Sequence, residues 1–369
     1  MDSLPDLPPL LWLAAGLGGL FGAVAQRTCF CTMGAVSDIV NMGDWNRMGM
    51  WLLAMGTAVL GTAGLQLAGL IDVANSIYTA PRLLWASHLM GGLLFGIGMV
   101  LASGCGAKTL VRLGGGNLKS LVVFLVMGLT ALATLKGLPA LLRVGLLDVL
   151  AVDLSAPGQD LPRLLQPLLG LPPATASALV AGSVGGLLLA APLLRADFRQ
   201  AEYILGGLAI GAAVVGGWFL SGHLAFVAEH PDTLQPAFLG TNSGRMESLT
   251  FVAPPAYALE LFATWSDASR KLTLGIATVL GVVAGSALVA LSRRSFRWEG
   301  FRDAEDTASH LIGAVLMGFG GVTALGCTIG QGVTGLSTLA VGSILTTAAI
   351  IAGSAVTMKI QYWLLMREA

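Results

Sequence analysis

Long runs of apolar residues, each followed by a short polar or charged stretch, make up almost the whole chain. A run of about 20 apolar residues is long enough to cross a bilayer as one α-helix. The pattern predicts nine such spans, and therefore an all-α, polytopic membrane protein. The nine predicted spans are 10–26, 48–71, 83–103, 120–135, 173–194, 203–222, 272–292, 311–326 and 336–358.

One uncharged run is too long for a single helix. Residues 311–358 include no charged side chain over 48 positions, and they contain the Gly-rich sequence 326–332. Irregular backbone cannot face lipid, because its N–H and C=O groups would lack partners. We therefore expect this break to be buried in protein or to line a cavity. We also expect residues 137–172 at the membrane interface, and the apolar stretch 249–255 dipping into the membrane.

The composition agrees with a membrane protein. Of the 369 residues, 55% are hydrophobic and 11% are charged, and the mean hydropathy is +0.80. An average soluble domain is about 25% charged, so the composition argues against a soluble enzyme and against a disordered chain. Basic and acidic residues balance at 20 each, which leaves no basic field for a nucleic acid. Asp2 and Asp6 stand where a secretory signal needs positive charge, so the first run is expected to be a retained span.

The basic residues predict the orientation. Nine spans put the two termini on opposite sides of the membrane. The side that faces the C-terminus then holds 13 Lys and Arg residues, against 7 on the other side. Because short cytoplasmic loops are enriched in Lys and Arg, the C-terminus is expected in the cytoplasm. For a bacterial inner-membrane protein, the N-terminus is then periplasmic.

An internal repeat divides the chain. Residues 88–105 and 310–327 match at a constant offset of 222, with 10 of 18 positions identical, and both stretches end in Gly-Cys. The halves are expected at 1–172 and 203–369, with four spans each. Residues 173–202 would supply a linking span and loop. A single linking span inverts the second half, and inverted repeats with broken helices are typical of secondary transporters.

Three of the four cysteines border Gly- or Thr-containing segments: Cys31, Cys105 and Cys327. Glycines let several backbone N–H groups point at a ligand, and a short helix beginning there favours an anion. A thiol adds a soft, weak donor that can meet a sulfur atom. Cys29 is expected to be a small buried hydrophobe instead.

Other chemistry remains open at this point. The 13 methionines and the Cys29-Phe30-Cys31 sequence are compatible with a Cu(I) transporter. A membrane-embedded sulfurtransferase would need an exposed cysteine of low pKa. His88 and His310 begin matching spans, and we expect them to cap or anchor their helices at the interface. Lys108 is either an ordinary cytoplasmic-side cation or the residue that holds a departing anion.

Three motifs resemble the YeeE/YedE sulfur-transport family. They are residues 26–31 followed by Asp38, residues 104–117, and residues 326–337. The resemblance implies a thiosulfate permease fold with nine spans, short re-entrant helices and an hourglass shape. It also implies that the three cysteines lie along the thiosulfate path, with Cys31 as the family cysteine of the first motif. This chain departs from the family pattern at Lys108, where Gly is common, and in having the additional Cys29.

Together these observations predict a transporter, not an enzyme, for thiosulfate or a similar small sulfur-containing anion. Another sulfur or selenium species is the alternative substrate. No catalytic residue, metal site, cofactor or nucleic-acid partner is expected. The expected partners are the anion, the lipid bilayer and a cytoplasmic sulfur-acceptor protein. The predicted substrate-binding residues are Cys31, Cys105, Cys327, Gly104, Gly106, Lys108, Gly326, Thr328, Gly330 and Gln331.

Overall fold

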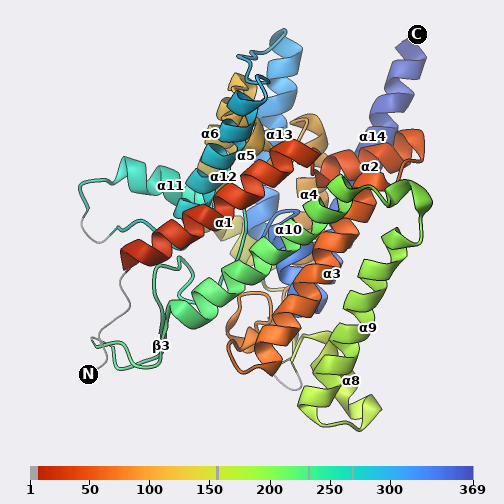
Figure 1. The fold of residues 1–369 in the computed structure, drawn as a ribbon. Helices are drawn as coiled ribbons and strands as arrows, with labels where there is room; N and C mark the ends of the chain where they lie inside the picture. Colours follow the sequence, from red (N-terminus) through yellow and green to blue (C-terminus); the bar gives the residue numbers. More distant parts are fainter. Residues whose placement is uncertain (1–6, 155–157, 232, 268–269, 369) are drawn as a thin grey trace.

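The protein is a bundle of long α-helices, described by a computed structural model over residues 7–154, 158–231, 233–267 and 270–368. Eight helical segments in it are long and apolar enough to cross a membrane. Helix α13 is not among those eight, and its first turn carries two acidic residues. The fold confirms an all-α, multi-pass membrane protein. The long helices are α1 (Leu7–Thr28), α3 (Asn46–Leu67), α4 (Trp85–Leu101), α6 (Leu118–Lys136), α9 (Pro173–Leu193), α10 (Ala201–Phe219), α12 (Leu274–Ser292), α13 (Ala304–Thr323) and α14 (Val341–Glu368) (Figure 1).

Short helices and turns connect the long ones. The short helices are α2 (Thr32–Met42), α5 (Gly106–Gly114), α7 (Leu138–Leu142), α8 (Leu161–Leu169) and α11 (Ala253–Ala263). The single turns are η1 (Val73–Asn75), η2 (Arg143–Leu147), η3 (Ala196–Phe198), η4 (Leu220–Leu224), η5 (Gly330–Gly335) and η6 (Leu336–Thr338). The Gly-rich break at 326–332 is buried throughout, as predicted, and runs into η5.

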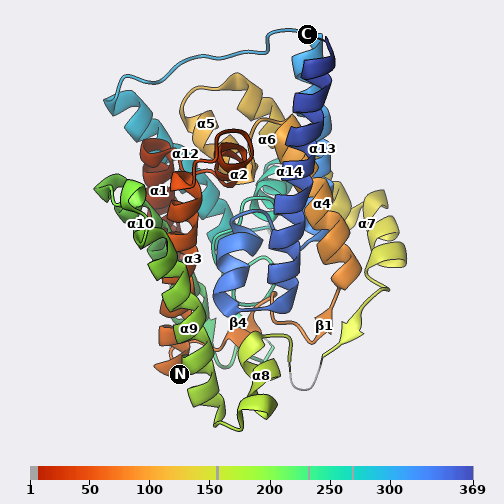
Figure 2. The ribbon, with the colours of Figure 1, turned by 90° about the vertical axis from the view of Figure 1, so that its right-hand side faces the viewer.

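Two antiparallel pairs of very short strands tie distant loops together. Strand β1 (Arg82–Leu83) pairs with β2 (Val152–Asp153), with Arg82 opposite Asp153. Strand β3 (Phe226–Val227) pairs with β4 (Ala237–Phe238), with Phe226 opposite Phe238. Strands β1 and β4 lie on the lower side in Figure 2, whereas α2 and α5 lie near the upper side (Figure 2).

Glycines allow α1 and α12 to pack with their backbones in contact. A methyl group at Gly18 would lie 2.1 Å from the Thr278 carbonyl oxygen, and one at Gly22 would lie 2.1 Å from that of Val282. Both partners advance by four residues, so the helices run parallel. Helices α10 and α3 pack closely in the same way, because a methyl group at Gly207 would lie 2.7 Å from the Met50 carbonyl oxygen. Such close approach through small residues is typical of helix pairs in membranes.

Helices α4 and α13, which carry the sequence repeat, cross each other in antiparallel directions. A methyl group at Gly91 would lie 2.7 Å from the Gly320 carbonyl oxygen, and one at Gly98 would lie 2.7 Å from that of Gly313. At the offset of 222, Gly91 corresponds to Gly313 and Gly98 to Gly320. The contact is therefore reciprocal, as in an interface with two-fold symmetry.

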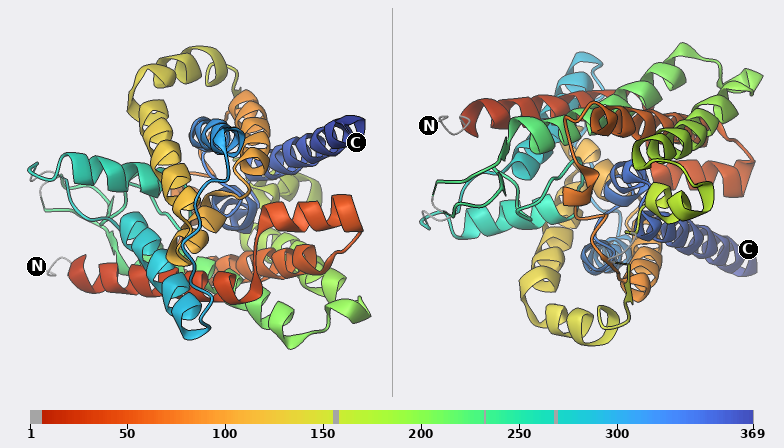
Figure 3. Two further views of the ribbon diagram at one scale, coloured as in Figure 1. Left: turned by 90° about the horizontal axis from the view of Figure 1, so that it is seen from above. Right: turned by 90° about the horizontal axis from the view of Figure 1, so that it is seen from below.

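Several other large contacts also join the first part of the chain to the last. Helix α4 packs on α14, α13 packs on α6, and α1 packs on α12. Seen from above, α13 lies between α6 and α4 (Figure 3). The helices near the two ends of the chain are thus interlocked in one bundle.

Candidate functional site

Helices α4 and α13 end in the same kind of turn, and each turn leads directly into a cysteine. Ser103 and Leu325, 222 positions apart, have left-handed backbone with φ of 55° and 60°. The next amide in each case, that of Gly104 or Gly326, donates to a carbonyl five residues earlier at 2.8 Å. This is the hydrogen bond of a Schellman-type helix end. The following thiols are therefore placed equivalently by the two halves of the repeat.

Cys105 is the N-cap residue of α5 and is buried. Helix α5 begins at Gly106, so the short helix expected after this thiol is present. A methyl group at Gly106 would lie 2.5 Å from the Phe251 carbonyl oxygen, which leaves no room for a larger residue. The thiol thus lies at the amino end of a helix, where the backbone carries a partial positive charge.

Cys31 occupies the same position on α2. It is the N-cap residue of that helix, and its Sγ accepts a hydrogen bond from the Gly34 amide at 3.4 Å. The thiols of Cys31 and Cys105 also lie next to each other and interact. The positive charges of Lys108 and Arg112, both on α5, act on Cys31. Two of the predicted cysteines and the predicted Lys108 therefore form one group.

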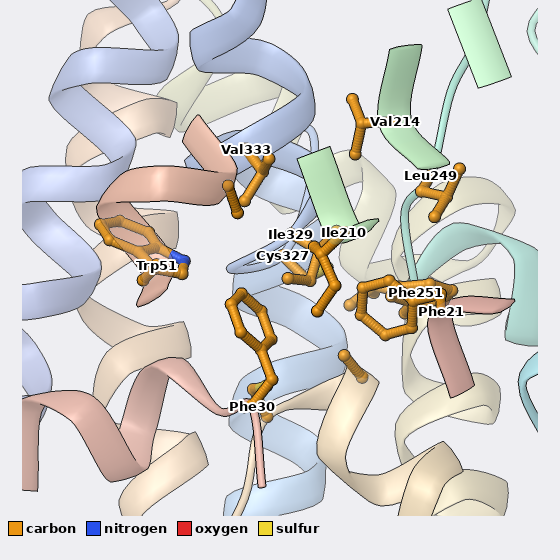
Figure 4. Packing of buried hydrophobic residues seen from close by; sticks show 14 of the residues in the cluster. Phe21, Phe30, Trp51, Ile210, Val214, Leu249, Phe251, Cys327, Ile329 and Val333 are labelled. Atoms are coloured by element: carbon orange, nitrogen blue, oxygen red, sulfur yellow. The ribbon is translucent and has the colours of Figure 1, made fainter. Parts of the chain in front are cut away.

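Cys327 joins this group through the residue that follows it. Its Sγ accepts a hydrogen bond from the Gly330 amide at 3.3 Å, and its side chain is fully buried. The side chain of Thr328 contacts the Cys105 thiol. Figure 4 shows Cys327 among apolar side chains that include Phe30 (Figure 4). We call the series Cys327, Cys105 and Cys31 the cysteine path.

The remaining predicted residues shape the turn around Cys327. Gln331 is fully buried, and its side-chain amide donates to the Ala324 carbonyl. In the described part of the chain, its Oε1 has no hydrogen-bond partner. A methyl group at Gly326 would lie 3.1 Å from the Gln331 side chain, and one at Gly330 would lie 2.4 Å from the Thr250 hydroxyl. The turn is thus tightly packed, and the Gln331 Oε1 in it remains available as an acceptor.

A second short repeat was not identified from the sequence. Residues 31–34 read Cys-Thr-Met-Gly and residues 327–330 read Cys-Thr-Ile-Gly. In both, the thiol accepts a hydrogen bond from the amide of the glycine three positions later. Comparing the segments around each cysteine would have revealed the pattern Cys-Thr-x-Gly. It shows that the first and third cysteines of the path have the same local structure.

A polar cavity of about 240 Å³ lies next to Gly104, beside the Cys105 end of the path. We call it the upper cavity, because α5 lies toward the upper side of Figure 2. Three cations, Arg112, Lys119 and Arg302, line it. Lys119 is paired with Asp306 at 2.8 Å, and Arg112 donates to the Ser103 carbonyl at 2.8 Å. Glu299 and Asp306 also line the upper cavity, so its wall combines cationic donors close to Cys105 with two carboxylates.

A second cavity of about 180 Å³ lies next to Gly326, beside the Cys327 end of the path. We call it the lower cavity, and four polar residues that line it are Tyr78, Arg143, Glu247 and Tyr257. None of them was predicted as a site residue. They come from loops and short helices whose polar residues gave no distinguishing signal in the sequence.

Two expectations about single residues are corrected. Cys29 is exposed, with a left-handed φ of 54°, so the prediction that it is buried is wrong. The chain turns sharply there between α1 and α2, which keeps the side chain out of the core. His88 and His310 are buried and hydrogen-bonded, to the Thr346 hydroxyl and the Asp306 carbonyl, both at 2.7 Å. They are held within the protein and do not anchor it in the interface.

Comparison with known proteins gives one family. The family model described as "Sulphur transport" matches residues 27–356. The chain is similar to the thiosulfate transporter TsuA of Escherichia coli K12, with 28% identity over 85% of this chain and 84% of that protein. It is also similar to the thiosulfate transporter TsuA of Spirochaeta thermophila, with 27% identity over 97% of this chain and the full length of that protein. The match covers both ends of the repeat and all three cysteines of the path, and the chain belongs to the sulphur transport family.

Proposed function

We propose that the protein takes up thiosulfate, or a similar small sulfur-containing anion, across the bacterial inner membrane. The observation that carries the proposal is the continuous series of contacts between the two cavities. It runs from Gly326 at the lower cavity through Cys327, Thr328 and Cys105 to Gly104 at the upper cavity, with Cys31 beside Cys105. The similarity to two thiosulfate transporters supports this substrate.

The direction of uptake follows from the distribution of charge. The upper cavity carries Arg112, Lys119 and Arg302, and the positive-inside rule assigns that side to the cytoplasm. The C-terminus is then cytoplasmic and the N-terminus periplasmic. The reciprocal crossing of α4 and α13 supports two inverted halves, 1–172 and 203–369. A reporter that fluoresces only in the cytoplasm should accordingly be active when fused to the C-terminus.

In the proposed relay, the anion passes from the lower cavity to Cys327, then to Cys105 and Cys31. Neutral thiols meet its terminal sulfur by S–H···S contacts, because a thiolate would repel a dianion. Backbone N–H groups at the starts of α2 and α5 stabilise the oxygens. Lys108 and Arg112 receive the anion on the cytoplasmic side. No covalent step is involved, so the protein is a transporter and not an enzyme. A sulfur-acceptor protein in the cytoplasm is the proposed next partner.

Thiols also account for substrate choice. Thiosulfate and sulfate have the same charge and differ by one sulfur in place of one oxygen. A sulfate oxygen loses strong hydrogen bonds to water when it binds against a thiol. The weak S–H donor does not replace them fully, so sulfate binds less well. The loss of one or two hydrogen bonds weakens binding by roughly ten- to a hundredfold, or about 1–3 kcal/mol.

Uptake of labelled thiosulfate into proteoliposomes tests the proposal. We expect intact thiosulfate to accumulate, with sulfate competing weakly and sulfite and selenite included as further competitors. Equal competition by sulfate would show that the cysteines do not select the substrate. Release of sulfite inside the vesicles would indicate a sulfurtransferase. Copper uptake without any effect of thiosulfate would indicate the Cu(I) alternative.

A further inference from the structure

Glu247 places a carboxylate in the lower cavity, where an anion is proposed to enter. It lies between η4 and α11 and lines the cavity together with Arg143, Tyr78 and Tyr257. Its Oε1 accepts a hydrogen bond from the Ser243 amide at 2.8 Å. Within the described ranges, this carboxylate forms no ion pair. A fixed negative charge at this place opposes the entry of an anion, so its presence needs an explanation.

The backbone around Glu247 is fixed by hydrogen bonds to two neighbouring elements. The Glu247 amide donates to the Ser221 hydroxyl at 3.1 Å, and that hydroxyl donates to the Glu247 carbonyl. The preceding amide, that of Met246, donates to the Asn75 carbonyl at 3.1 Å. These bonds fix the segment to η4 on one side and to η1 on the other. The backbone at Glu247 is therefore fixed at the cavity, and the bond from the Ser243 amide holds the carboxylate there.

The charged and titratable groups around Glu247 do not neutralise it. Arg143 is on the cavity wall, but its guanidinium faces an aspartate of its own segment at 3.6 Å. Arg245 donates to a backbone carbonyl at 3.4 Å. Tyr78 and Tyr257 are neutral hydroxyl groups that sense the charge of Glu247. Two of these four neighbours are thus neutral and the other two are engaged elsewhere.

Burial raises the pKa of Glu247 above its ordinary value, and the hydrogen bonds from Ser243 and Asn242 oppose that rise. A dianion in the same cavity would raise the pKa further, because like charges repel strongly at short range away from bulk water. Binding of the anion and binding of the proton must then favour each other by the same factor.

We propose that Glu247 is a proton-binding residue, and that the lower cavity accepts a dianion only when Glu247 is protonated. The proposal rests on the thiosulfate transport proposed above and assigns a pH dependence to its first step. The proton comes from the periplasmic solution and forms an O–H bond on the carboxyl group. No other bond changes. The neutral carboxyl then becomes a hydrogen-bond donor for an anion oxygen in place of a repelling charge.

The expected pH dependence is steep. Only the protonated fraction of the protein binds the anion, so the apparent Kd increases up to about tenfold for each pH unit above the pKa of Glu247. Uptake by the wild type should therefore rise as the external pH falls. Binding should also remove protons from a weakly buffered solution, which a pH-sensitive dye detects. Glu247→Gln should bind thiosulfate with a pH-independent Kd over the same range and release or take up no proton.

The experiment uses the full-length protein in detergent for binding and in proteoliposomes for uptake. Glu229→Gln is the matched control, because Glu229 is an exposed carboxylate of the same loop region; it should behave as the wild type. Glu247→Asp keeps a titrating carboxyl and should keep a pH dependence. The Glu247 proposal would be overturned if Glu247→Gln kept the pH dependence and the proton uptake of the wild type. The transport function itself would be overturned if the wild type neither bound nor transported thiosulfate at any pH.

Thermal unfolding shows whether Glu247→Gln is folded and gives a second test. A carboxyl whose pKa is raised in the folded state costs stability as the pH rises from its unfolded value of about 4.3 through the folded pKa. Glutamine removes that cost, since it cannot ionise and still accepts from Ser243. The variant should therefore melt higher than the wild type at neutral pH, with the difference vanishing in acid. A lower melting temperature at neutral pH would contradict a destabilising charge at Glu247.

Discussion

A thiol at the start of a short helix is the recurring chemical feature of this protein. Cys31 and Cys327 each accept a hydrogen bond from the glycine amide three residues later. Each is followed by a buried threonine, Thr32 or Thr328. The amide holds each sulfur in place by one hydrogen bond, and the thiol hydrogen remains a separate weak donor. In the proposed relay, this hydrogen meets the sulfur of the passing anion.

Replacing Cys327 should abolish uptake without preventing insertion. Cys327→Ala removes the thiol that directly follows Gly326, a residue of the lower cavity wall, and leaves a small apolar side chain that packs in the same place. Cys327→Ser should be nearly as harmful, because a hydroxyl is a harder partner for sulfur. We expect both variants to lose thiosulfate uptake by at least about tenfold. A loss of this size corresponds to the free energy of roughly one hydrogen bond to a charged group. Growth on thiosulfate as the sole sulfur source, with membrane levels checked by immunoblot, measures the effect.

Cys29→Ala is the matched control for that variant. Cys29 is exposed and lies outside the path, so its replacement should leave growth and uptake close to wild type. Normal growth of Cys327→Ala would refute the cysteine relay. A defect in Cys29→Ala as large as that of Cys327→Ala would show that the loss has another cause.

The cysteines could be predicted from the sequence because their motifs are local. The lower cavity could not, because it is built from loops that meet only in the folded chain. Glu247 lines the same cavity as Gly326 because Met246 pairs with Ser76 in an isolated bridge. Nothing in the sequence around Glu247 records that pairing. The exposed position of Cys29 was missed for a similar reason, since it depends on a left-handed turn at a residue other than glycine.

At the scale of elements, the apolar pattern located the helices but not all of their ends. Helix α13 begins at Ala304 and not at 311, because the Asp303 side chain caps it by accepting from the Asp306 amide at 2.8 Å. Helix α14 begins at Val341 and not at 336. The preceding residues form η5 and η6, and Leu339 has a left-handed φ of 56°. Capping by acidic side chains and irregular turns both lie outside what hydropathy detects.

The close contact between α1 and α12 predicts a sharp difference between two glycines of α1. Gly18→Ala places a methyl group 2.1 Å from the Thr278 carbonyl oxygen, so the helices must separate. Overpacking of this kind costs about 1–3 kcal/mol, and we expect a lower melting temperature in detergent. Gly16→Ala is the control, because nothing lies within 4 Å of the added methyl group. It should be neutral or stabilising, since alanine is the better helix former by about 1 kcal/mol. Equal melting temperatures for the two variants would contradict the described packing.

At the scale of the whole molecule, the repeat predicted two halves, but not how they are assembled. The largest helix contacts join opposite halves: α1 with α12, α4 with both α13 and α14, α3 with α10, and α6 with α13. A sequence repeat alone is equally compatible with two separate four-helix units. The two arrangements differ in which glycine-containing helix faces pack together. The sequence does not decide between them, because small residues occur on several faces of these helices. Only the folded structure shows that each half supplies packing surfaces for the other.

This exchange of helices predicts how the protein behaves when it is cut. A break between Leu171 and Pro172, in the short connection between α8 and α9, severs no helix. Each fragment has apolar helices that insert into a bilayer, but their glycine faces then lack the backbones that fill them. Expressed alone, residues 1–171 and 172–369 should each be degraded rapidly and bind no thiosulfate. Expressed together, they should associate and recover uptake, because the contacts between halves do not depend on the cut connection. Co-purification of an affinity-tagged first fragment with the second measures the association. A single fragment that is stable to protease in the membrane would show that the halves are independent units, and would contradict the interlocked bundle.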